Sequence, residues 1–254
     1  ENALLAKYAG GLGNDWTPVR ALGAHIKGTN GKSQGVVPFL KVVNDTAVAV
    51  NQGGKRKGAA CVYLEPWHAD IEEFLELRDN TGDEARRTYN LNLANWIPDV
   101  FMRRVDEDGM WSLFDPKVVP HFTDLYGADF EKAYVEAEQK GLYMRQTKAR
   151  DLYARMMKTL AETGNGWMTF KDACNIKNNQ TGQDGNVIHL SNLCTEITEI
   201  TNQAETAVCN LGSVNLARYI NEGEFDFEKL AYTVQLAVRF LDKVIDINYY
   251  PTDA

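Results

Sequence analysis

Short apolar segments alternate along the chain with longer amphipathic ones, and this alternation limits the possible folds more than any other feature. Ala59–Leu64 is apolar throughout and ends just before Pro66, which predicts a buried strand. Residues 88–96 and Trp167–Phe170 are further strand candidates. Strands that alternate with helices favour an α/β fold with a mainly parallel sheet, either open or closed into a barrel.

The helix candidates carry apolar residues at the helical period. Residues 36–51, 71–82 and 128–140 are predicted to be helices, and another helix around Met156 ends at Gly164. The last helix has the clearest pattern. Its apolar positions are Leu230, Val234, Ala237, Val238, Leu241, Val244 and Ile245.

The chain reads as one domain over residues 1–254. It contains no internal repeat, no low-complexity run and no linker that would divide it. The sequence begins inside a helix-like pattern without an initiator Met and stops just after the last helix. We therefore expect the central part of a longer protein, truncated at both ends.

Composition excludes several classes of function. The net charge of −8 argues against nonspecific binding of nucleic acid, which needs a basic surface. No apolar run reaches the length of a membrane span, and no signal-peptide pattern begins the chain. Four cysteines in 254 residues do not indicate a disulfide scaffold. We expect a reduced, cytoplasmic protein in which thiol chemistry is catalytic.

Two glycine-rich basic stretches occur in the first 58 residues, a region that is predicted to form loops close to a ligand. In residues 20–33, the Gly-Lys-Ser tripeptide at 31–33 looks like the end of a P-loop, but Ile26 stands where that motif needs glycine. The basic residues suit a triphosphate, although spacing alone favours a solvated loop. Residues 52–58 form the second stretch, and having two such loops favours nucleotide binding.

An amide, a thiol and a carboxylate follow one another at alternate positions, as Asn192, Cys194 and Glu196. If the backbone is extended, these side chains share one face and point into one pocket. A second thiol, Cys209, follows fifteen residues after the first. The structural alternative is a strand with a buried cysteine. Because burying an unpaired carboxylate is costly, the glutamate on that face favours a functional site.

A metal site is not expected at these thiols. His189, Cys194 and Cys209 lack the short paired spacing that is typical of structural zinc. The remaining cysteines, Cys61 and Cys174, have no activating base beside them and are predicted to be small buried side chains. The chain also lacks the CxxC motif of thiol–disulfide oxidoreductases, which makes that class a distant alternative.

Family-like motifs are spread along the whole chain. In order, they are RALG (20–23), GTNG (28–31), NQGG (51–54), YLEPWH (63–68), WSL (111–113), SNLCTEI (191–197), AVCNL (207–211) and DKVIDINYYP (242–251). With these motifs in this order, the chain resembles the large, catalytic subunit of class I ribonucleotide reductase. The resemblance implies a ten-stranded α/β barrel with a central finger loop, of which this chain would form a part.

The resemblance implies a role for each residue of the thiol segment. Cys194 would carry a thiyl radical that removes the 3′-hydrogen of a ribonucleoside diphosphate inside a closed pocket. Glu196 would be the general base on the 3′-hydroxyl, and Asn192 would hold the substrate hydroxyls and this carboxylate. Cys209 would be one of two cysteines that supply electrons and end as a disulfide. Gly11 would offer a backbone contact to the substrate.

The resemblance also assigns a role to the two basic loops. Residues 20–33 would bind a deoxynucleoside triphosphate or ATP effector near the interface of a homodimer of large subunits. The residues that match effector contacts are Lys7, Arg20, Lys27 and Gly28. Residues 52–58 would lie between effector and substrate, where Gln52 and Arg56 are candidates to transmit which base is bound.

Further partners follow from the same resemblance. A metal-containing small subunit would supply the radical, thioredoxin or glutaredoxin would be the reductant, and this chain itself would bind no cofactor. The family's second reducing cysteine, phosphate loop, relay tyrosines and shuttle cysteines lie outside the matching region, so we expect the 254 residues alone to be inactive. The alternative is a non-catalytic nucleotide-binding or assembly segment of a split subunit.

Overall fold

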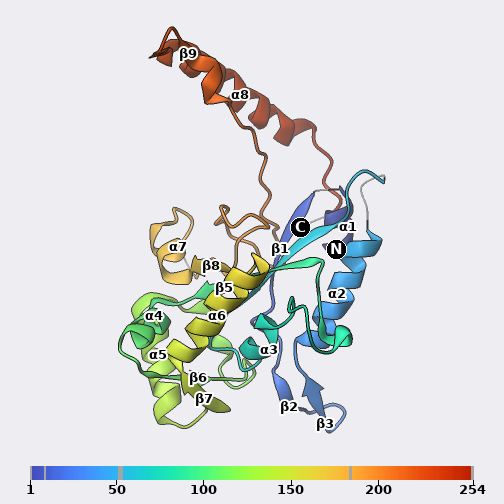
Figure 1. The fold of residues 1–254 in the computed structure, drawn as a ribbon, viewed down its shortest axis with the longest axis vertical. Helices are drawn as coiled ribbons and strands as arrows, with labels where there is room; N and C mark the ends of the chain where they lie inside the picture. Colours follow the sequence, from blue (N-terminus) through green and yellow to red (C-terminus); the bar gives the residue numbers. More distant parts are fainter. Residues whose placement is uncertain (1, 9, 51–53, 183–184, 253–254) are drawn as a thin grey trace.

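A four-stranded parallel sheet forms the centre of the computed structural model, which describes residues 2–8, 10–50, 54–182 and 185–252. The strands lie in the order β1-β4-β5-β8 (Figure 1). Their bounds are Gly11–Asp15 for β1, Ala59–Leu64 for β4, Leu91–Ile97 for β5 and Trp167–Phe170 for β8. Gly13 pairs with Cys61, and Ala94 pairs with Trp167. Each connection between neighbouring strands contains helices, as parallel pairing requires.

The other described elements connect these strands or follow them. The α-helices are α1 Asn2–Tyr8, α2 Val37–Ala49, α3 Ile71–Leu75, α4 Asp99–Asp106, α5 Gly127–Gln139, α6 Ala149–Thr163, α7 Lys171–Lys177 and α8 Phe227–Ile247. Antiparallel pairs form between β2 Leu22–Ile26 and β3 Gly31–Gln34, β6 Met110–Leu113 and β7 Arg145–Lys148, and β9 Ile220–Asn221 and β10 Glu224–Phe225. Short 3-10 helices are η1 Glu84–Arg86, η2 Pro120–Asp124 and η3 Leu216–Tyr219.

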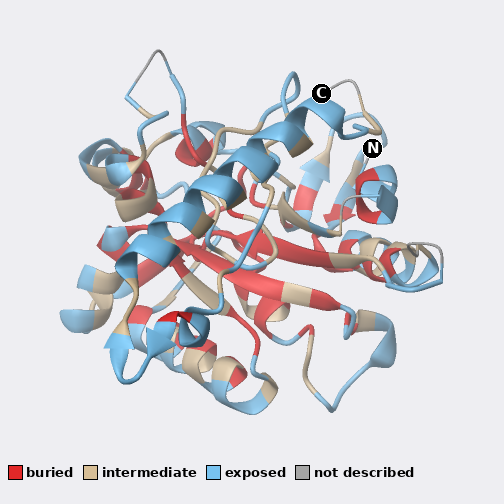
Figure 2. Ribbon diagram, turned by 90° about the horizontal axis from the view of Figure 1, so that it is seen from above, coloured by how far each residue is buried: buried red, intermediate tan, exposed pale blue. Residues whose placement is uncertain are grey.

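The two faces of the sheet are covered differently, because alternate residues of a strand point to opposite sides. Val62 and Leu64 of β4 lie in the main apolar core, together with side chains of α2, α3, α4 and α6. Cys61 and Tyr63 point the other way, into a second cluster that contains Ile188. Figure 2 shows the strands as the buried centre of the molecule. Helices therefore cover one face of the sheet, and the chain that follows α7 covers the other.

Helix α8 extends away from this core (Figure 1). None of its residues is buried, and Phe240 is 71% exposed. The predicted apolar stripe packs only in part, against the segment that precedes the helix: a Cβ atom on Gly212 would lie 3.7 Å from Leu241 Cδ1. Of the helices in the described ranges, none is long and apolar enough to cross a membrane.

The four strands are parallel and alternate with helices along the chain, which confirms the predicted fold class. The strands β4 and β8 have the predicted bounds. In the described residues the sheet is open rather than closed into a barrel. Two local predictions are wrong. The strands β1, β2 and β3 lie in the glycine-rich region that was predicted to be loops. Helix α3 ends at Leu75 instead of continuing to Gly82, because the chain turns back and the Thr88 amide donates to the Leu77 carbonyl.

Candidate active site

The chain after α7 returns across the sheet and lies directly on β1. A Cβ atom on Gly13 would be 1.9 Å from the carbonyl oxygen of Ser191, and one on Gly11 would be 2.5 Å from Leu193 Cδ2. Real Cβ atoms essentially never approach closer than 3.0 Å, so glycine at both positions allows this contact. Gly11 faces Leu193 and Gly13 faces Ser191, so the loop runs antiparallel to β1.

The first candidate thiol, Cys194, lies in a tight turn of this loop, residues 187–200, which is called the thiol loop below. Residues 193–195 form the turn, and Thr195 has a φ angle of 72°. This left-handed conformation is rare for a β-branched residue. The prediction that Asn192, Cys194 and Glu196 share one face of an extended backbone is therefore wrong, because the chain turns between them.

The turn nevertheless brings the amide and the carboxylate together. Asn192 Nδ2 donates to Glu196 Oε1 at 3.1 Å, and Asn192 Oδ1 accepts from the Ile197 amide at 3.4 Å. Ser191 Oγ donates to the Ile197 carbonyl at 2.5 Å, which closes the base of the turn. Cys194 is exposed at the tip. Glu196 is also exposed, so the expected cost of burying its charge does not arise.

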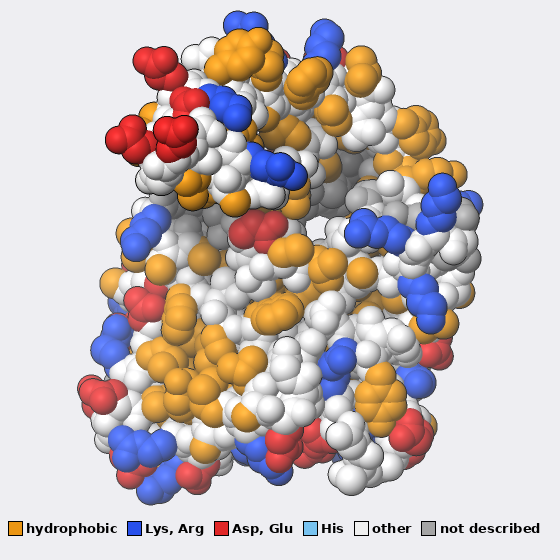
Figure 3. Space-filling model, turned by 45° about the horizontal axis from the view of Figure 1, so that its top comes forward, with side chains coloured by type: hydrophobic (Ala, Val, Ile, Leu, Met, Phe, Trp, Pro, Cys, Tyr) orange, Lys and Arg blue, Asp and Glu red, His pale blue; other side chains and the backbone are white. Residues whose placement is uncertain are grey.

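A cavity of 820 Å³ opens beside the loop, and a hollow is visible on the face shown in Figure 3. Its walls come from α1, from β1, from residues 56–59 and from the chain between residues 190 and 211. Among the residues lining it are Gly11, Arg56, Asn192, Cys194 and Cys209. Burial, and then the negative charges of Glu196 and Glu199, raise the pKa of the Cys209 thiol. Both candidate thiols therefore open into one cavity, next to carboxylates.

The other two cysteines stand apart from this chemistry. Cys61 is fully buried in β4, and burial raises the pKa of its thiol to about 12, as expected for a small core side chain. Cys174 in α7 is only half-buried, so the prediction of burial is met in part. The described cysteines are all free thiols. In the described ranges, His, Cys, Asp and Glu form no group of three or more that could hold a metal ion.

The candidate effector residues are dispersed. Lys7 lies in α1, whereas Arg20 precedes the β2–β3 hairpin and Lys27 and Gly28 lie in its turn. Figure 1 shows α1 and this hairpin at opposite ends of α2. The structure therefore does not bring Lys7 together with the hairpin turn.

The candidate specificity residues differ in what can be said of them. Arg56 is exposed and lines the cavity beside the thiol loop. Its neighbour Lys57 lines the same cavity. Gln52 lies outside the described residues. The basic loop is thus connected in space to the candidate site through its second half.

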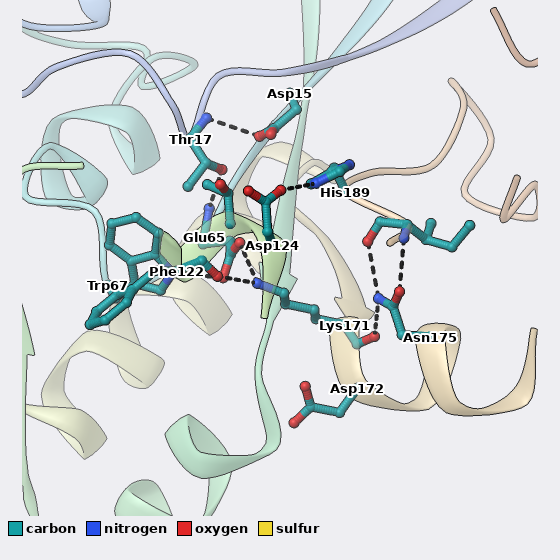
Figure 4. A network of polar contacts seen from close by, with 12 residues as sticks. Asp15, Thr17, Glu65, Trp67, Phe122, Asp124, Lys171, Asp172, Asn175 and His189 are labelled. Atoms are coloured by element: carbon teal, nitrogen blue, oxygen red, sulfur yellow. Dashed lines mark hydrogen bonds and ion pairs between the residues drawn. The ribbon is translucent and has the colours of Figure 1, made fainter. Parts of the chain in front are cut away.

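A buried polar network, which sequence reasoning missed, lies at the carboxyl ends of the parallel strands (Figure 4). Lys171 follows β8 and is fully buried, with its Nζ donating to Glu65 Oε1 at 2.8 Å and to the Phe122 carbonyl at 2.9 Å. Glu65 follows β4, and its other oxygen accepts from Trp67 Nε1 at 2.6 Å. Asp15 ends β1 and lines the cavity. Position was the available signal, since sites in α/β folds form where parallel strands end.

Burial dominates the electrostatics of this network. It raises the pKa of Glu65 to about 7, against the opposing attraction of the Lys171 ammonium. Burial also raises the pKa of Asp15, although hydrogen bonds from Thr17 and the charge of His189 oppose the change. The structure therefore holds two carboxyl groups that gain protons more readily than exposed ones, beside a cavity wall.

Two side chains tie the loop backbone to the rest of the fold before the turn begins. Asn175 of α7 is fully buried, donates from Nδ2 to the Ile188 carbonyl at 3.0 Å and accepts from the Ile188 amide at 2.8 Å. Tyr63 donates from its hydroxyl to the Asn192 carbonyl at 2.7 Å. Sequence reasoning gave neither residue a role, although Tyr63 belongs to the YLEPWH motif, because both contacts join distant parts of the chain.

Comparison with known proteins gives one family. The model of the ribonucleotide reductase barrel domain matches residues 1–254. The chain is 58% identical over 258 residues to the ribonucleoside-diphosphate reductase subunit alpha of Chlamydia pneumoniae, covering 99% of this chain and 24% of that protein. It is 50% identical over 251 residues to the large subunit of Danio rerio, covering 98% and 31%, and 47% identical over 274 residues to that of Arabidopsis thaliana, covering 100% and 33%. The chain thus spans about a quarter to a third of these relatives.

Proposed function

The chain belongs to the ribonucleotide reductase barrel-domain family, and on this premise we propose that it carries the radical thiol of a ribonucleoside-diphosphate reductase large subunit. One observation carries the proposal. The hydrogen-bonded pair of Asn192 and Glu196 flanks Cys194, and this thiol opens into the same cavity as Cys209. Two thiols and an amide thus open into one cavity, and the carboxylate of Glu196, which does not itself line the cavity, is hydrogen-bonded to that amide.

The chemistry assigns each group a separate task. A thiyl radical on Cys194 takes the hydrogen atom from C3′ of a ribonucleoside diphosphate, which forms an S–H bond and leaves the radical on the sugar. Glu196 accepts the proton of the 3′-hydroxyl, and the protonated 2′-hydroxyl leaves as water. A pair of thiols that includes Cys209 supplies that proton and then gives a hydrogen atom to C2′ and an electron to the sugar, while Glu196 returns its proton to the 3′-oxygen. The two thiols end as a disulfide. Cys194 then returns the hydrogen atom to C3′, so that the products are a deoxyribonucleoside diphosphate, water and a disulfide.

The geometry supports the roles given to the two polar residues. The Asn192 side chain donates to Glu196 and accepts from Ile197, so its orientation is fixed at both ends. A base held by a neighbour in this way loses less freedom when it engages a substrate hydroxyl. Gly11 lines the cavity, where it would offer its backbone to the substrate, and Leu193 fills the space beside it that a side chain would occupy.

Regulation by nucleotides belongs to the same proposal. A deoxynucleoside triphosphate or ATP effector would bind at residues 20–33, with Lys7 contributed from elsewhere in a homodimer. Arg56 supports a link between effector and substrate, because it lies on the wall of the cavity that holds the thiols. The specificity loop would act by changing which base this wall accepts.

The whole enzyme would need parts that this chain does not contribute. A second reducing cysteine would complete the pair with Cys209, a metal-containing small subunit would supply the radical, and thioredoxin or glutaredoxin would reduce the disulfide in the cytoplasm. We propose that the 254 residues alone do not turn over.

The test uses the full-length protein that contains this chain, together with its radical-supplying subunit. Cys194→Ser is expected to abolish reduction of ribonucleoside diphosphates, because the O–H bond of serine is too strong to form the oxygen radical in its place. Effector binding and thermal unfolding should be unchanged. Cys174→Ser is the matched control, since this half-buried thiol does not line the cavity. Retained reduction in Cys194→Ser would sink the assignment.

A further inference from the structure

Tyr63 occupies the face of the sheet on which the thiol loop lies. Its side chain is fully buried, and its ring meets that of Trp96 edge to face, with centroids 6.1 Å apart and planes at 81°. Such aromatic contacts fix the orientation of a ring. Tyr63 is not among the residues lining the cavity, so it does not touch the contents of the cavity.

The hydroxyl group of this tyrosine reaches the loop at the residue just before the turn. It donates to the Asn192 carbonyl at 2.7 Å, across 129 positions of the sequence. Burial raises the pKa of Tyr63 far above its ordinary value, so the hydroxyl keeps its proton and stays a donor. The bond therefore joins a strand of the sheet to the loop directly before the turn, whereas Asn175 holds the loop earlier, at Ile188.

Asn192 connects this anchor to the reacting groups. Its backbone carbonyl is held by Tyr63, while its side chain donates to Glu196 and accepts from the Ile197 amide. A shift of the Asn192 backbone would move the carboxylate, and it would also move Cys194, two residues away. A single hydrogen bond from the sheet thus influences both the base and the thiol.

We propose that Tyr63 is a positioning residue, which sets the height of the Cys194 turn above the sheet through its hydrogen bond to Asn192. This inference rests on the proposed function for its effect on catalysis. The anchoring itself is a property of the fold and can be measured without substrate.

The test compares Tyr63→Phe with the parent, in the full-length protein and with its radical-supplying subunit. The change removes one oxygen atom and no ring contact, so the fold is kept. Loss of one hydrogen bond is expected to lower kcat by about 3- to 10-fold. KM for the ribonucleoside diphosphate should change less than about twofold, since Tyr63 does not touch the cavity. Amide hydrogen exchange in residues 187–200 should become faster by a factor similar to the loss in kcat.

Tyr134→Phe is the matched control. Tyr134 is equally buried, and its hydroxyl bonds the Ser112 amide at 2.6 Å and the Ser112 carbonyl at 3.0 Å, in the main core on the helix side of the sheet. It should leave kcat and loop exchange unchanged. Replacement of Tyr63 by 4-aminophenylalanine keeps a donor at the same ring position and is expected to restore both.

The outcomes separate the two proposals. Parental kcat and parental loop exchange in Tyr63→Phe would overturn the inference, as would lost activity with unchanged exchange, or an equal effect in Tyr134→Phe. If the parent reduces no ribonucleoside diphosphate, the proposed function fails. The exchange comparison still decides whether Tyr63 holds the loop, because it needs no turnover.

Discussion

Gly13→Ala is the substitution that tests most directly whether the thiol loop lies on β1. The new Cβ atom would stand 1.9 Å from the carbonyl oxygen of Ser191, whereas real Cβ atoms essentially never come within 3.0 Å of another atom. The loop must therefore move by at least about 1.1 Å at Ser191, three residues before Cys194. The obstacle is a loop carbonyl rather than the sheet, so the fold itself should survive.

A displacement of about 1 Å at reacting groups can reduce a rate by about 100-fold. We expect Gly13→Ala to lower kcat of the full-length reductase by about that factor. The free energy of unfolding should fall by about 1–3 kcal/mol, because the added methyl group meets backbone atoms that must shift. The assay is reduction of a ribonucleoside diphosphate, with urea unfolding measured on the same samples.

Gly212→Ala provides the control, because a Cβ atom there meets Leu241 Cδ1 at an ordinary 3.7 Å. It should keep parental stability and more than half of the parental kcat. If Gly13→Ala retains near-parental kcat, the loop does not rest on β1 in the working enzyme, and the reasoning is refuted. Equal loss of activity in both variants would point to a general intolerance of alanine instead.

The remaining predictions concern the buried network and the turn. Lys171→Met leaves the Glu65 carboxylate without its cation and should lower the free energy of unfolding at pH 8 by about 3–5 kcal/mol. The double variant Lys171→Met/Glu65→Gln should lose less stability than Lys171→Met alone. Losses that add up in urea unfolding would contradict the coupling of the two residues. The pKa of Glu65 is about 7 in the folded protein and 4.5 in the unfolded chain. Its contribution to the free energy of unfolding is therefore fully present below pH 4.5 and falls by about 3 kcal/mol as the pH rises to 7. Glu65→Gln should flatten that part of the pH–stability curve, and an unchanged slope would show that another group is responsible. Thr195→Gly should raise the free energy of unfolding by about 1 kcal/mol, because glycine adopts the left-handed φ angle without strain. A higher midpoint of thermal unfolding supports this, and an unchanged midpoint contradicts it.

Local features of the chain predicted a substantial part of this structure. The apolar run Ala59–Leu64 forms a strand with the expected bounds, because a buried strand of a parallel sheet is apolar on both faces. The segment Trp167–Phe170 also has the expected bounds, as a partly exposed edge strand. Gly164 ends α6 in the left-handed conformation that glycine adopts without strain. The roles proposed for Asn192, Cys194 and Glu196 also come from residue types and from motifs of the family.

Local sequence patterns did not predict how these groups are arranged in space. Glycines at 11 and 13 predicted loops, yet they form a strand that pairs with β4, and the chain after α7 packs onto them. The thiol segment predicted an extended backbone, yet it turns at Thr195. In the first case a contact between distant segments overrode the local preference, as tertiary packing commonly does. In the second case hydrogen bonds within residues 191–197 close the turn.

The sequence by itself thus determined the family, the fold class and the candidate reactive groups, since these follow from composition, periodicity and motifs. Tertiary structure decided which residues support those groups. Tyr63 meets Asn192 across 129 positions, and Lys171 meets Glu65 across 106. Such pairs form only when parallel strands bring their carboxyl ends and their faces together. No spacing along the chain encodes them, which is why the anchors of the thiol loop and the buried charge network emerge only in the folded protein.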